Sequence, residues 1–185
     1  MFSAMAGLLA REIHQTRPFA SPAMEAYLAL IRTAEVLARD VATALRAYDL
    51  THAQYNILRI LRGAAPQGLT CGTIAERLVT LDPDVTRLLD KLETRGLVTR
   101  ERQVADRRVV IVRITAPGDA VCNHPGLCAT LGTIHERRFA ALGPQQTATL
   151  IDLLENLRAP ARGVADDTPT DAVPLTGSPA AVAPT

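Results

Sequence analysis

The chain has 185 residues, a length that suits one domain of ordinary size with or without appended segments. Apolar residues make up 48% and charged residues 21%, which excludes a wholly disordered chain, and the 3% of aromatic residues disfavours an aromatic-rich β-sandwich. The net charge of +1 is an average over the whole chain and by itself indicates no nucleic-acid partner.

The two ends of the chain bound the expected fold. Near the N-terminus, Arg11 and Glu12 interrupt an apolar stretch before it reaches the length of a signal peptide or a membrane span, so we expect a cytoplasmic protein. Residues 159–185 contain five of the 12 prolines and no periodic pattern, which predicts a disordered tail. The three cysteines are an odd and sparse set, which argues against a secreted disulfide framework.

Three helices are predicted in the first half of the chain. Apolar residues at three- and four-residue steps predict a long helix from Pro22 to Tyr48. The residues Thr51 to Gln54 form a capping box, which starts a second helix that ends at Gly63. Thr70 is expected to cap a third, short helix.

A helix and a hairpin follow directly. Asp82–Pro83 is typical of a cap and a first helical position, and Gly96 of the residue that ends a helix. Two short helices joined by a tight turn form a helix-turn-helix. Segments 97–102 and 109–115 are β-branched and apolar around a polar turn, which predicts a two-stranded hairpin. Residues 51–115 are therefore expected to be a winged helix-turn-helix within a mainly α (α+β) fold.

Residues 116–158 are predicted to be helical again, with breaks at Pro125–Gly126 and at Gly143–Pro144. The last of these helices carries an apolar stripe that includes Leu150 and Leu157. Together with residues 1–50, these helices present more apolar surface than one winged unit can cover. We therefore expect both flanking regions to be dimerisation helices that bury each other in a homodimer.

The charge is unevenly distributed along the chain. The segment Thr86–Arg113 contains eight basic and four acidic residues, a net charge of +4, which leaves −3 for the rest. These basic residues lie on the second helix of the helix-turn-helix and on the hairpin, the two elements that a winged helix presents to DNA. A solvated mixed-charge helix face is the alternative for the helix, but Arg107 and Arg108 at an exposed turn favour DNA.

Four stretches of this region together resemble the MarR family of bacterial transcriptional regulators. They read THAQYNIL at 51–58, IAERL at 74–78, VTRLLDKLETRGLV at 85–98 and DRR at 106–108, with Ile114–Thr115 closing the hairpin. The resemblance implies a homodimer whose two winged lobes bind a palindromic DNA operator. It also implies repression, usually relieved by a small-molecule ligand or an oxidant.

Carried over by position, the resemblance assigns DNA contacts to the start of the recognition helix and to the tip of the hairpin. Arginine pairs with guanine through two hydrogen bonds, and a narrow minor groove attracts guanidinium, which suits these positions. Asp106 would orient the hairpin loop, and Asp84 would either accept from cytosine or, as we favour, stabilise the helix N-terminus. The expected DNA-binding residues are Asp84, Val85, Thr86, Arg87, Lys91, Arg107 and Arg108.

The remaining reactive residues suggest no catalytic chemistry. Cys71 follows a cap residue, where backbone amides favour the thiolate; a redox role competes there with a simple packing role, which we favour. Cys122, His124 and Cys128 match no compact zinc spacing, so no metal site is expected. No catalytic or cofactor-binding motif occurs, which predicts neither an enzyme nor a cofactor. The alternative function is a winged-helix module for protein–protein interaction without DNA binding.

Overall fold

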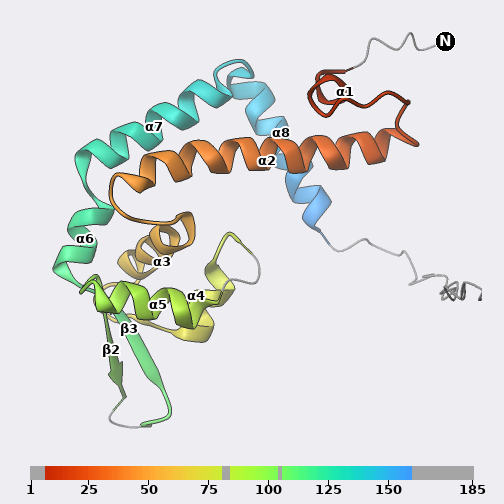
Figure 1. The fold of residues 1–185 in the computed structure, drawn as a ribbon. Helices are drawn as coiled ribbons and strands as arrows, with labels where there is room; N and C mark the ends of the chain where they lie inside the picture. The colour runs from red at the N-terminus through yellow and green to blue at the C-terminus, as the bar shows by residue number, and fades with distance from the viewer. Residues whose placement is uncertain (1–6, 81–83, 104–105, 160–185) are drawn as a thin grey trace, which may run out of the picture. The chain divides into compact units, whose positions relative to one another are not determined.

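The computed structural model describes residues 7–80, 84–103 and 106–159 (Figure 1). These residues form two units that divide between Ala141 and Leu142. The predicted mainly helical fold with a wing is confirmed. The disordered tail predicted for residues 159–185 lies, except for Ala159, outside the described residues.

Eight helices are present in the described residues. None of them is long and apolar enough to cross a membrane. The first unit contains α1 (Leu8–Glu12), α2 (Pro22–Arg46), α3 (His52–Gly63), α4 (Cys71–Arg77), α5 (Val85–Thr94), α6 (Ala116–Cys122) and α7 (Pro125–Phe139). The second unit contains α8 (Gly143–Arg158).

Side-chain caps start the helices at most of the predicted positions. The capping box of α3 is complete, because the Gln54 amide donates to Thr51 Oγ1 at 3.2 Å and the Thr51 amide donates to Gln54 Oε1 at 3.0 Å. Thr70 Oγ1 accepts the amide of Thr73 at 3.2 Å at the start of α4. These bonds satisfy amides that have no partner within the helix.

The start of α5 differs from the sequence prediction. The expected cap and first position, Asp82 and Pro83, lie outside the described residues. The helix begins at Val85, and Asp84 is its N-cap, with Oδ1 accepting the amide of Arg87 at 3.0 Å. An aspartate side chain reaches the amide three residues further on, so Asp84 at this position can cap the helix that contains Arg87.

The sheet has one strand more than the predicted hairpin. Strands β1 (Leu69–Thr70), β2 (Val98–Arg102) and β3 (Val110–Ile114) are antiparallel in the order β1-β3-β2. Strand β1 pairs Leu69 with Val112. The preceding residue, Gly68, has φ +76°, and a Cβ there would lie 2.4 Å from the Val112 carbonyl oxygen, so only glycine permits this approach.

One hydrophobic core joins the winged elements to the helices on either side of them. It begins at Leu45 of α2, continues through α3, α4, α5 and the sheet, and ends at Leu131 of α7. Within this core α5 packs against α3, α4 and β2, all of which lie in the predicted 51–115 region. Its fully buried members are Leu45, Ile57, Leu58, Leu61, Ile74, Leu89, Leu92, Val98, Val112, Cys122 and Leu127.

Apolar side chains are exposed along the N-terminal half of α2. Tyr27 is 62% exposed and Ile31 is 45% exposed, whereas Leu45 at the other end of the helix is fully buried. Helix α8 has no buried residue and exposes Ile151, Leu153 and Leu157. The single chain therefore covers only part of the apolar stripes that the sequence predicts.

Candidate nucleic-acid interface

Arg100 on β2 connects the wing to α5. Its Nη1 lies 2.5 Å from Asp90 Oδ1 and 3.5 Å from Glu93 Oε2, and its Nη2 donates to the Thr86 carbonyl at 3.1 Å. The Arg100 side chain is only 24% exposed, so these charge-assisted bonds are partly shielded from water. They fix the wing against α5 and offset the negative charge of Asp90 and Glu93.

The tip of the wing is closed by Asp106. Its Oδ1 accepts the amide of Arg108 at 2.9 Å, and its carbonyl accepts the amide of Val109 at 3.0 Å. The Gln103 amide donates to the Val109 carbonyl at 2.9 Å on the other side of the loop. The side chains of Arg107 and Arg108 are exposed and form no hydrogen bond or ion pair with a described residue.

The eight basic residues of Thr86–Arg113 fall into two groups. Arg95, Arg100 and Arg113 bind carboxylates and carbonyl groups of the protein itself. The others form no ion pair within residues 7–80, 84–103 and 106–159, and this group consists of Arg87, Lys91, Arg102, Arg107 and Arg108. Four of these five were expected DNA contacts. Arg102, at the end of β2, was not singled out, although its charge was part of the basic count.

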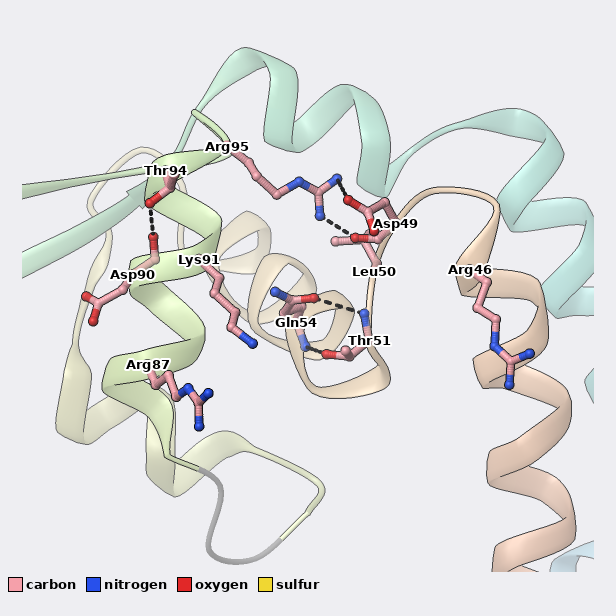
Figure 2. A pocket seen from close by; sticks show the side chains of 10 residues that line it. All are labelled: Arg46, Asp49, Leu50, Thr51, Gln54, Arg87, Asp90, Lys91, Thr94 and Arg95. Carbon is pink, nitrogen blue, oxygen red and sulfur yellow. Dashed lines mark hydrogen bonds and ion pairs between the residues drawn. The ribbon is translucent and has the colours of Figure 1, made fainter.

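A surface depression of about 640 Å³ lies beside α5 and is called the hollow (Figure 2). Arg95 bridges α5 to the corner between α2 and α3, because it donates to the carbonyls of Tyr48, at 3.2 Å, and of Asp49. Cationic side chains from α2 and α5 face the space from its two sides. It is lined by Arg46, Asp49, Leu50, Thr51, Gln54, Arg87, Asp90, Lys91, Thr94 and Arg95.

A second cavity of about 370 Å³ is bounded mainly by α3, α6 and α7. It brings together Cys122 and Cys128, which the sequence pattern did not connect with any site, and places Tyr55 and Arg59 of α3 near them. Both cysteines are free, and the Cys128 thiol lies 3.8 Å from the Cys122 carbonyl. In the described part of the chain, no group of three or more potential ligands is arranged to hold a metal ion.

The three thiols should differ in reactivity. Burial raises the pKa of the Cys122 thiol, which is 1% exposed, whereas Cys128 is exposed and Cys71, the first residue of α4, is half-buried. Because only the thiolate reacts readily, iodoacetamide near neutral pH should modify Cys128 and Cys71 well before Cys122. Peptide mass spectrometry over time measures the order. Labelling of Cys122 as fast as Cys128 in the folded protein, with both equal after denaturation, would contradict this prediction.

Comparison with known proteins agrees with this geometry. The MarR family model matches residues 50–110, which contain α3, α4, α5 and β2. The multiple antibiotic resistance protein MarR of Escherichia coli K12 is 33% identical over 118 residues, which cover 61% of this chain and 76% of that protein. The chain belongs to the MarR family. Members of this family are transcriptional regulators, so the chain is a MarR-family transcriptional regulator and not an enzyme.

Solved MarR-family structures are similar over most of the chain. A MarR transcription factor from Planctomyces limnophilus is 37% identical, with a TM-score of 0.57 over 75% of this chain and 99% of that one. A mutant MarR from E. coli complexed with operator DNA is 29% identical, with a TM-score of 0.62 over 70% and 91% of the two chains. The resemblance seen in the sequence is thus accompanied by similarity of fold.

Proposed function

We propose that this MarR-family protein binds double-stranded DNA sequence-specifically through α5 and the wing. The observation that carries the proposal is the group of cations on these two elements that form no ion pair with any described residue, while Arg100 neutralises the carboxylates of α5 that face β2. The first turn of α5 enters the major groove with the exposed Thr86 and Arg87, whereas Val85, also an expected contact, is buried in the core, and Asp84 contributes by capping that turn. The similarity to a mutant MarR from E. coli that is complexed with operator DNA supports DNA binding.

The wing and the later part of α5 complete the contact. Arg107 or Arg108 enters the minor groove, where a narrow groove attracts guanidinium, and Asp106 holds the loop that carries them. Lys91 lies one turn after Arg87 on α5 and is suited to a phosphate. A winged module that docks on an acidic protein would use the same cations, so an experiment must separate the two functions.

We further propose a homodimer that acts as a repressor on a palindromic operator. The apolar side chains exposed on α2, and independently those on α8, support a partner copy, because such surfaces are costly in water. Two copies related by a two-fold axis present two α5 helices, which a palindromic site matches, and a dimer seated on an operator blocks other proteins from the same DNA. Sedimentation measures the dimer directly.

Release by a small molecule is the last part of the proposal. The second cavity lies within the size range of ligand sites. The amide of Cys128, which lines this cavity, donates to the His124 carbonyl at 3.0 Å, and His124 Nδ1 lies 3.1 Å from the Tyr48 hydroxyl. The Tyr48 carbonyl in turn accepts from Arg95, the C-cap residue of α5. This contiguous set of contacts connects the cavity to α5 and supports an effector, with an oxidant acting at Cys71 as the other route.

Selection of bound sequences from random double-stranded DNA tests the proposed function. We expect enrichment of a palindrome whose half-sites lie about 10 base pairs apart, since two lobes on one face of DNA are separated by one helical turn. Enrichment without symmetry would contradict the dimer on a palindrome but not DNA binding. No enrichment and no binding at low salt would contradict DNA binding and favour the protein-interaction module.

A further inference from the structure

The hollow beside α5 carries a surplus of positive charge. Four of its lining side chains are cationic and two are carboxylates. Both carboxylates are engaged by arginines, because Asp90 lies 2.5 Å from Arg100 and Asp49 lies 3.8 Å from Arg95. The three cations that remain, Arg46, Arg87 and Lys91, have no ion-pair partner among the described residues.

The three unpaired cations come from two separate elements. Arg87 and Lys91 are four residues apart, so they lie one above the other on α5. Arg46 is the last residue of α2 and lies across the hollow from them (Figure 2). The first helical turn of α3 lies between them, and its capping box uses the amides of Thr51 and Gln54. The three cationic side chains supply the positive charge that attracts an anion to the hollow.

We propose that the hollow lies against the DNA backbone, with Arg46 and Lys91 each binding a phosphate from its own side, while α5 lies in the major groove. The inference rests on the proposed function. On α5, Arg100 of the wing binds Thr86, Asp90 and Glu93, whereas Arg87 and Lys91 lie further round the helix toward the hollow, which Asp90 also lines. A helix in the major groove has a phosphate backbone on each side, and the wing accompanies only one of them.

Arg46 is the new element of this contact. It lies outside the expected winged region 51–115 and outside the matched residues 50–110, on the long helix assigned to dimerisation. A phosphate bound by Arg46 joins α2 directly to the DNA. The rotation of α5 about its own axis is then fixed on both flanks, by the wing on one side and by this phosphate on the other.

The test is the salt dependence of DNA binding by full-length Arg46→Ala, measured on a duplex recovered by selection. Loss of one phosphate contact lowers the slope of log affinity against log salt by about one unit. Arg46→Lys should retain the wild-type slope, because it keeps the charge. The matched control is Arg39→Ala on the same helix, a cation that does not line the hollow and should leave the slope unchanged. Preference among related duplexes should be unaltered in all three variants.

The outcomes separate this inference from the proposed function. If Arg108→Ala lowers the slope but Arg46→Ala does not, the proposed phosphate contact of Arg46 is wrong, whereas the proposal of DNA binding stands. If the wild-type protein binds no duplex, the proposed function itself fails.

Discussion

A variant that lacks both guanidinium groups at the wing tip, Arg107→Ala/Arg108→Ala, is expected to bind its selected duplex roughly 100-fold more weakly than the wild-type protein. Both side chains are exposed, and the loop is closed by Asp106 and Gln103 instead, so the substitutions remove charge without opening the loop. The slope of log affinity against log salt should fall by about two units if each arginine neutralises one phosphate. Fluorescence anisotropy across a salt series measures both quantities.

Arg137→Ala/Arg138→Ala is the matched control for this variant. These neighbouring arginines on α7 carry the same charge, but both bind Asp40, at 3.6 Å and 2.6 Å. Removing them changes the net charge of the protein equally and should leave the salt slope near its wild-type value. If both double variants weaken binding to the same extent, the loss reflects the overall charge of the protein, and the wing would not be a specific contact.

Local sequence patterns predicted the helices and strands that carry the basic residues of α5 and the wing. Three of the predicted features depend only on contacts within a few residues, so the sequence alone is enough to predict them. They are the capping box at Thr51, the cap at Thr70 and the glycine that ends α5, Gly96. The hairpin is likewise a local structure. The family resemblance then identified which helix and which loop carry the reading residues, although the roles assigned to individual side chains are still predictions.

Long-range contacts account for what the sequence did not reveal. Strand β1 has two residues, too few to alternate, and it exists because Leu69 pairs with Val112 on β3. The basic residues of α5 and the wing look alike in the sequence, but Arg95 is bound 46 residues away at Asp49. Arg46 belongs to a helix that the pattern assigned to dimerisation. Its place in the hollow depends on how α2, α3 and α5 pack together.

Gly118→Ala is expected to reduce the free energy of unfolding by about 3 kcal/mol or more, because a buried backbone contact leaves no room for a side chain. A Cβ on Gly118 would lie 2.1 Å from the Leu97 carbonyl oxygen and 3.0 Å from Ile114 Cγ1. The same carbonyl accepts the amide of Thr115 at 3.1 Å, so it cannot move away without breaking the junction between the sheet and α6. Urea denaturation followed by circular dichroism measures the loss.

Gly132→Ala is expected to have the opposite effect on the free energy of unfolding. Gly132 lies within α7, and a Cβ there would meet nothing within 4 Å, so alanine should stabilise the protein by about 0.5–1 kcal/mol through its better helix propensity. The pair of variants separates a clash from a general effect of adding a methyl group. Equal urea midpoints for Gly118→Ala and the wild-type protein would show that α6 does not pack directly on Leu97.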